Sequence, residues 1–198
     1  MQTTSKKLGD LYKGKVKNIH HNLIKRCKRN DSIAQMKIYD LYNRAVFGTI
    51  IRLVKNTMEA EDLMQETFIS AFSNLDSYRS EASFGTWIKK IAVNKSLNVL
   101  KKNSPDFLDF RGENISDNNV SEIDESTNRF TLEEIKQEIN RLPEGYRVVI
   151  NLYLLEGMDH DEISELLNVK PVTSRSQYLR AKKKLAENLM NNYNERQA

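Results

Sequence analysis

The sequence predicts an all-α protein made of two small helical domains joined by a flexible acidic linker. Helix-breaking residues are scarce, with only 7 Gly and 3 Pro among 198 residues. Apolar residues recur at helical spacing in two blocks, and a polar stretch without that spacing separates them. Scarce breakers favour helices over a fold with many turns. Because 39% of the residues are hydrophobic, the chain can bury a core.

Composition divides the chain into four parts. We expect a basic N-terminal extension over residues 1–22, a helical domain over 23–102, a linker over 103–130 and a second helical domain over 131–198. The linker is rich in Asp and Glu and has few residues that could be buried, so we expect it to be flexible. A basic–acidic–basic layout suits a protein that meets a polyanion with separate patches, but solvated helix faces would carry the same charges.

One helix of the first block has two distinct faces. Thr57 is its predicted N-cap, and Ala60, Leu63 and Phe68 belong to an apolar face with i, i+3, i+4 spacing. The other face is polar and acidic, so it is a candidate protein-binding surface. Its residues are Glu61, Asp62, Gln65 and Glu66.

The loop and helix that follow combine aromatic and cationic side chains. Unstacked bases need aromatic platforms and their backbone needs positive charge, so this mixture is typical of single-stranded DNA binding. Core packing would also explain Phe84 and Trp87, and we favour it for Trp87. The candidate DNA-binding residues here are Tyr78, Arg79, Ser80, Lys89, Lys90, Asn94, Lys95 and Asn98.

The second block has the outline of a helix-turn-helix. Thr131 with Glu134, and Asp159 with Glu162, are spaced as capping boxes. Pro143 ends the first stripe, and a further helix is expected to run through Leu155. A short helix, a turn over residues 168–171 and a longer basic helix then follow.

The longer helix is the candidate recognition helix, beginning near Thr173. Arg can bind guanine through two donors and Gln can bind adenine in the same way. Tyr178, Ala181 and Leu185 have core-facing spacing instead. An ordinary helical hairpin with a solvated basic face is the alternative. The candidate duplex-binding residues are Lys170, Thr173, Arg175, Ser176, Gln177 and Arg180.

Several classes of protein are disfavoured. Cys27 is the only cysteine, so no disulfide can form within the chain, and three histidines are too few and too badly spaced for zinc. No phosphate-binding loop or catalytic constellation is evident, so we expect no catalytic residue, metal or cofactor and no enzyme activity. No stretch reaches the roughly 20 apolar residues that cross a bilayer, and no secretory signal is evident. We therefore expect a cytoplasmic protein.

The chain resembles the extracytoplasmic-function (ECF) subfamily of bacterial sigma-70 factors, subunits of RNA polymerase. Residues 60–68 resemble the AEDLxQxxF signature of sigma region two, and residues 78–88 resemble its F-R-x-x-A-S-F-x-T-W-L stretch. Residues 142–147 are similar to the start of region four, and residues 161–167 and 180–185 to its helix-turn-helix. The likeness covers almost everything except the basic extension and the linker.

This resemblance implies a promoter-recognising protein. The Asp62 face would bind the clamp helices of the polymerase β′ subunit, and the second domain would meet the β flap. Residues 78–98 would capture and melt the −10 element, and residues 173–180 would read the −35 element. An anti-sigma factor is a further candidate partner. Asn98, Lys101 and the run over residues 173–177 depart from the family pattern, which leaves the promoter sequence open.

Two rival functions remain to be weighed. A conventional helix-turn-helix regulator would use its first block to bind an effector or to dimerise, yet that block exposes an acidic face and has no ligand-binding loop. A helical nucleic-acid enzyme would need a cluster of carboxylates. Glu61 and Asp62 are adjacent, but neighbours on a helix diverge by about 100° and do not easily share one metal.

Overall fold

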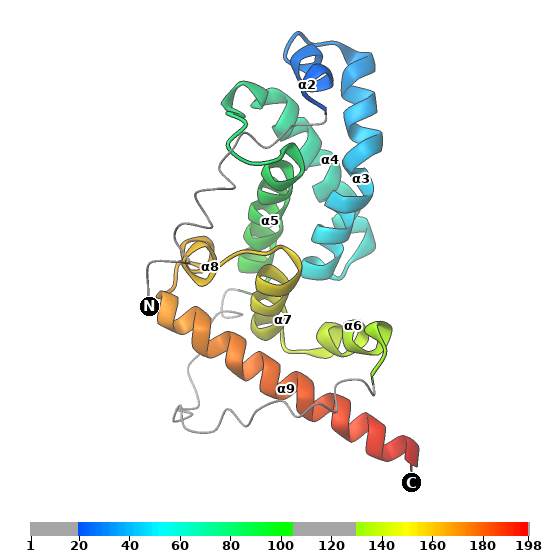
Figure 1. Cartoon of the computed structure of the whole chain (residues 1–198), viewed down its shortest axis with the longest axis vertical. Helices are drawn as coiled ribbons and strands as arrows, with labels where there is room; N and C mark the ends of the chain where they lie inside the picture. The colour runs from blue at the N-terminus through cyan, green and yellow to red at the C-terminus, as the bar shows by residue number, and fades with distance from the viewer. Residues whose placement is uncertain (1–19, 105–129, 198) are drawn as a thin grey trace, which may run out of the picture. The chain divides into compact units, whose positions relative to one another are not determined.

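The computed structural model describes residues 20–104 and 130–197. All regular elements in these two ranges are helical (Figure 1), which confirms the predicted all-α class. The chain separates into two compact units, with the boundary between Ser96 and Leu97. Nearly all of the basic extension and of the acidic linker predicted over 103–130 lies outside the described residues.

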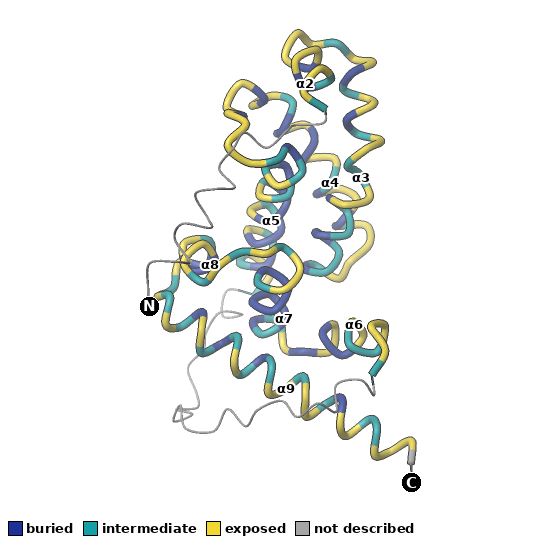
Figure 2. The backbone as a smooth tube through the Cα atoms, in the orientation of Figure 1, coloured by how far each residue is buried: buried dark blue, intermediate teal, exposed yellow. Residues whose placement is uncertain are grey.

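The first unit is built around three long helices, α3 (Ser32–Val54), α4 (Thr57–Ser73) and α5 (Phe84–Asn103), although the end of α5 from Leu97 onward lies beyond the unit boundary. A short helix, α2 (His21–Cys27), precedes them, and a 3₁₀ turn, η1 (Leu75–Ser77), lies between α4 and α5. Each long helix has a buried stripe and an exposed face (Figure 2). The stripes include Ile38, Val46 and Ile50 of α3, Ala60, Leu63 and Phe68 of α4, and Phe84, Ile88 and Ala92 of α5.

The turn between α3 and α4 sets where the acidic helix begins. Lys55 takes the left-handed conformation at the C-cap of α3, with φ of 63°. Asn56 is extended, and its side-chain oxygen accepts from the Glu59 backbone N–H at 3.1 Å. Thr57, the predicted N-cap, is the first helical residue, so the prediction is wrong by one position. Asn is at least as good an N-cap as Thr, which accounts for the difference.

The second unit holds α6 (Leu132–Arg141), α7 (Glu144–Ile150), α8 (His160–Leu167) and α9 (Pro171–Gln197). Both predicted capping boxes are present, at Thr131 with Glu134 and at Asp159 with Glu162. A core cluster joins α6, α7 and α9, and the predicted core residues Tyr178, Ala181 and Leu185 belong to it. Its buried members are Ile139, Leu142, Ile150 and Ala181, and its partly buried members are Ile135, Tyr146, Tyr178 and Leu185.

The helix expected to run through Leu155 does extend to that residue, but its last five residues are not α-helical. A π-helical segment, η3 (Asn151–Leu155), continues α7, and the Glu156 backbone N–H donates to the Asn151 carbonyl at 3.0 Å. Asn151 is buried, and its side-chain N–H donates to the Arg147 carbonyl at 2.8 Å. Short π-helical segments are frequent at functional sites. This one carries Tyr153, which contacts the helix-turn-helix.

The cap at Asn56 gives a testable difference between neighbouring residues. Asn56→Ala removes the acceptor of the Glu59 N–H, so we expect the free energy of unfolding to fall by about 1 kcal/mol. Thr57→Ala, the matched control, leaves that hydrogen bond in place and should cost less. Chemical denaturation of both variants measures the two values. A larger loss for Thr57→Ala would contradict the assignment of Asn56 as the cap.

Candidate nucleic-acid and protein interfaces

The four predicted protein-binding residues of α4, namely Glu61, Asp62, Gln65 and Glu66, are all exposed. The structure brings them together because the buried stripe of α4 occupies the opposite side of the helix. Met58 and Ile69, with 78% and 66% of their surface exposed, lie at helical spacing with Asp62 and Gln65. Sequence reasoning missed Met58, although its spacing of four from Asp62 could have revealed it. Exposed apolar side chains beside carboxylates suit a protein interface.

The candidate DNA-binding residues of α5 divide into two groups. Lys90, Asn94 and Asn98 are exposed and four residues apart, so they share one face of the helix. Lys89 and Lys95 are partly buried. The Lys95 ammonium lies 3.1 Å from a carboxylate oxygen of Glu66, a residue predicted for the protein-binding face. This ion pair joins α4 and α5, so the two candidate surfaces meet along one edge.

The structure corrects the role predicted for Tyr78. Its side chain is buried, with 5% of the residue exposed, and its hydroxyl donates to the Ala82 carbonyl at 2.8 Å. The ring packs against Phe84 and Trp87, with centroids 5.5 and 5.3 Å away. Tyr78 therefore supports the loop from within and offers no platform to a base. Arg79 and Ser80 of the same loop are exposed.

Residues 160–180 form the predicted helix-turn-helix. Asn168 caps α8 in the left-handed conformation, with φ of 56°, and α9 begins at Pro171 rather than near Thr173. Proline suits this first position because a helix leaves its first N–H groups unpaired. Lys170 and Arg175 are exposed. Three further candidates, Thr173, Ser176 and Arg180, are partly exposed.

Gln177 lies on the inner face of α9, so the prediction that it binds a base is corrected. The residue is 1% exposed and shares this face with Ser174, 1% exposed, and Ala181, fully buried. Its side-chain oxygen is buried and accepts no hydrogen bond in the described part of the chain. The outer face instead exposes Val172 and Leu179, which sequence reasoning missed. An apolar side chain at such a position can contact the methyl group of thymine.

A ring cluster fixes the start of α9 on the rest of the second unit. The rings of Tyr153 and His160 stack with centroids 4.6 Å apart, and Tyr178 lies 4.4 Å from Tyr153. His160 Nδ1 is 2.9 Å from the Ser174 hydroxyl oxygen, which links α8 directly to α9. Burial lowers the pKa of His160, and the charge of Arg175 lowers it further. The neutral imidazole is thus the form that this packing favours.

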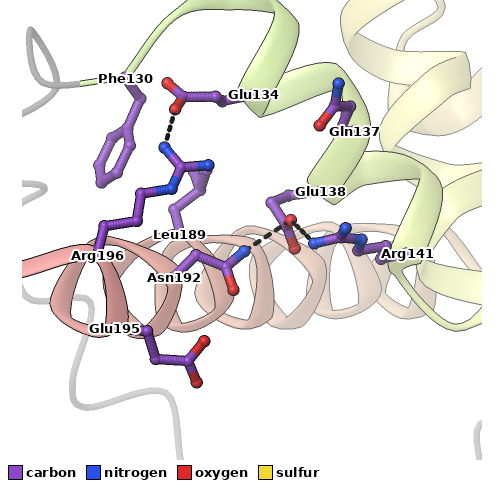
Figure 3. Close-up of a pocket in the computed structure, with 9 residues that line it drawn as sticks. All are labelled: Phe130, Glu134, Gln137, Glu138, Arg141, Leu189, Asn192, Glu195 and Arg196. Atoms are coloured by element: carbon purple, nitrogen blue, oxygen red, sulfur yellow. Dashed lines mark hydrogen bonds and ion pairs between the residues drawn. The ribbon is translucent and has the colours of Figure 1, made fainter. Parts of the chain in front are cut away.

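A polar cavity of about 350 Å³ lies between α6 and the end of α9 (Figure 3). Glu138 accepts hydrogen bonds from Arg141 at 2.6 Å and from Asn192 at 2.8 Å. Glu134 binds Arg196, and the Thr131 backbone N–H together with Arg196 lowers the pKa of Glu134 to about 2. Because these charges pair with one another, the cluster ties α9 to α6.

Within residues 20–104 and 130–197, no three His, Cys, Asp or Glu side chains lie close enough together to hold a metal ion. No helix in the same ranges has the length and apolar character that crossing a membrane requires.

Comparison with known proteins identifies the class to which this fold belongs. Residues 38–105 match the family model for Sigma-70 region 2, and residues 132–185 match that for Sigma-70, region 4. The first range covers most of α3 and all of α4 and α5, and the second runs from α6 into α9. The two regions therefore contain the acidic face and the helix-turn-helix, respectively.

Whole-chain relatives narrow the class further. The chain is 30% identical over 177 residues to the ECF RNA polymerase sigma factor SigW of Bacillus subtilis, covering 84% of this chain and 94% of that protein. It is 32% identical over 170 residues to the ECF RNA polymerase sigma-E factor of Escherichia coli K12, covering 81% and 88%. The chain belongs to the sigma-70 family, within its ECF subfamily. Proteins of this family act in promoter-specific transcription initiation and are regulators rather than enzymes.

Solved structures share the fold. The structure of CnrH in complex with the cytosolic domain of CnrY superposes with a TM-score of 0.53 at 19% identity, covering 85% of this chain and 96% of CnrH. The sigma factor RpoE of Bartonella quintana, solved with the anti-sigma factor NepR, gives 0.52 at 22% identity, covering 79% and 96%. Both structures are complexes with a second protein, and the helical fold recurs in both.

The buried amide of Gln177 leads to a prediction that separates packing from DNA binding. A buried polar atom without a partner costs about 1–3 kcal/mol, so Gln177→Met should maintain or raise the free energy of unfolding. Its affinity for an upstream promoter duplex should stay within about twofold of the original. Arg175→Met, the matched control on the outer face, should weaken that binding instead. A loss of duplex affinity in Gln177→Met without a loss of stability would contradict the buried placement.

Proposed function

We propose that this sigma factor captures and melts the −10 element with its first domain and reads the −35 element as duplex with its second. The single observation that carries the proposal is that the two units offer different surfaces. One presents an exposed polar stripe on α5 beside an exposed loop, and the other presents a helix-turn-helix. We place the domain limits at 23–102 and 131–198, and the protein in the cytoplasm.

Core polymerase is the proposed partner of the α4 face. Four polar or acidic side chains there are exposed, and Met58 and Ile69 add apolar area at the same helical spacing. An apolar contact framed by carboxylates suits a basic protein surface, where complementary charge increases the association rate and selects the partner. The clamp helices of the β′ subunit are the proposed binding surface, with the β flap meeting the second domain.

Strand capture is proposed for the exposed loop residues Arg79 and Ser80 and for the stripe of Lys90, Asn94 and Asn98. Cations and amides in that arrangement can follow a sugar–phosphate backbone and bind the edges of unstacked bases. Lys89 and Lys95 lie at the margins of this surface. Tyr78 contributes by holding the loop, and the ring of Trp87, which packs against Tyr78, is only partly buried.

Duplex reading is proposed for the outer face of α9. Arg175 is exposed near the N-terminus of that helix, the part of a recognition helix that enters the major groove. Lys170 and Arg180 are proposed to bind phosphates on either side, and Thr173 and Ser176 can bind base edges or phosphates. Val172 is the candidate for an apolar contact.

An anti-sigma factor is proposed as a further partner, because both structural neighbours above were solved in complex with another protein.

Promoter templates that differ only in the −10 region can separate the two DNA surfaces. Arg175→Ala should weaken recognition of the upstream element by about 1–3 kcal/mol, on duplex and on a template with a pre-melted bubble alike. Lys90→Ala with Asn94→Ala should impair open-complex formation on duplex and have a smaller effect on the bubble. Transcript yield from both templates is the measurement. Identical behaviour of the two variants on both templates would refute the division of labour.

Charge reversal tests the proposed polymerase-binding face. Asp62→Lys combined with Glu61→Lys places cations opposite a partner surface that is expected to be basic. Like charges that face each other across an interface cost several kcal/mol. Co-purification with core polymerase should therefore be lost, while the thermal unfolding of the free protein changes little. Glu133→Lys with Glu187→Lys makes the same charge change in the second unit and should still bind. Retained binding by the α4 variant would rule out this face.

A further inference from the structure

Helix α2 carries a concentrated positive charge outside the matched family regions. The helix ends at Cys27, whereas the match to region 2 begins at residue 38. All four cations of its last turn and of the residues just after it are exposed. They are Lys25, Arg26, Lys28 and Arg29. We call these four residues the α2 basic turn.

The α2 basic turn is held beside the loop proposed to capture the promoter strand. Ile24 and Cys27 are buried, with 4% and 2% of each residue exposed, so the helix is packed into the first unit. At its far end, the Lys28 ammonium lies 3.8 Å from a carboxylate oxygen of Asp76 in η1. Asp76 stands two residues before Tyr78, which begins that loop.

Aromatic contacts anchor the other end of the helix to the same region. The ring of His20, just before α2, meets Tyr42 of α3 edge-on at 5.7 Å, and Tyr42 meets Phe84 at 5.2 Å. Phe84 is the first residue of α5 and is itself in contact with Tyr78. Both ends of α2 are therefore fixed to residues that support the exposed loop and the start of α5.

Within residues 20–104 and 130–197, two cations of the α2 basic turn have carboxylate partners and two have none. Arg26 contacts Asp31 through two of its nitrogens, each at 2.7 Å, and Lys28 contacts Asp76. For Lys25 and Arg29 no ion pair is present in the described part of the chain. A helix C-terminus favours cations, which accounts for Lys25 and Arg26 in the last turn. Arg29 lies beyond the helix, so the helix dipole does not account for it.

We propose that Lys25 and Arg29 bind phosphates of promoter DNA next to the strand held by the loop and α5. This inference rests on the proposed function, and it assigns a nucleic-acid surface to a helix that neither family region includes. Phosphate contacts position a protein on DNA without reading the sequence. The α2 basic turn should thus increase affinity for every promoter alike and leave base preference unchanged.

Salt dependence tests the proposal directly, because each phosphate that a protein neutralises releases counterions. Holoenzyme containing Lys25→Ala with Arg29→Ala is compared with the unmodified holoenzyme on a bubble promoter over a range of KCl concentrations. The slope of log affinity against log salt should become shallower by about 0.7–0.9 for each lost contact, hence by about 1.4–1.8 in total. Lys37→Ala with Arg44→Ala removes one Lys and one Arg from exposed positions of α3 and should leave the slope unchanged.

The outcomes separate this proposal from the function on which it rests. An unchanged slope, with the −10 bubble still preferred over a scrambled one, would overturn the α2 contact and spare the proposed function. Equal slope changes in both double variants would also overturn it, because the effect would then follow net charge alone. Weakened binding to core polymerase with an unchanged slope would assign the α2 basic turn to a protein partner instead. An unmodified holoenzyme that shows no bubble preference would overturn both proposals together.

Discussion

The burial of one face of α9 determines what the second unit can offer to DNA. Ser174, Gln177 and Ala181 pack inward at intervals of three and four residues, which turns Arg175, Val172 and Leu179 outward. This orientation does not rest on apolar contacts alone. The His160 hydrogen bond to Ser174 and the stacked rings of Tyr153, His160 and Tyr178 hold the start of the helix. Any rotation of α9 would have to break this packing before it could present a different set of side chains.

The same constraint organises the first unit, where the inner faces of α4 and α5 leave two different outer faces. The Lys95–Glu66 ion pair lies where those faces meet. A partly exposed ion pair of this kind contributes at most about 1 kcal/mol to stability. The ion pair matters for its position, because it pairs one cation of the candidate DNA surface with one carboxylate of the candidate polymerase surface. The remaining charges of each face then point to separate partners.

The sequence predicted the elements that depend on local chemistry. Both capping boxes were correct because Ser/Thr/Asp followed by Glu three residues later is a signal that acts within one helical turn. The exposure of the acidic face of α4 agrees with the prediction, because the apolar stripe determines which side of the helix is buried. The start of α9 at Pro171 and the N-cap of α4 at Asn56 each differ from the prediction by one or two residues. In both places, neighbouring residues are nearly equally suited to begin a helix.

The failures have a common physical cause. In the first turns of α9, polar residues occupy both faces of the helix, so the sequence alone does not determine which face is buried. Gln177 is therefore predicted to be on the exposed face, whereas the structure has it on the buried face. Tyr78 lies in a loop, where no period indicates burial, and its core role follows from contacts with Phe84 and Trp87. The π-helical segment after Ile150 was not predicted either, because no local sequence pattern distinguishes it from an α-helix; its first residue, Asn151, is buried.

As a member of the ECF subfamily, this chain directs RNA polymerase to particular promoters. The most direct test adds the purified protein to core polymerase lacking any sigma factor, on genomic DNA, and maps the 5′ ends of all transcripts. We expect new start sites that share two short sequence elements at a fixed spacing, one to be melted and one to be read as duplex. Transcripts no different from those of core polymerase alone, or new start sites without shared upstream elements, would contradict it.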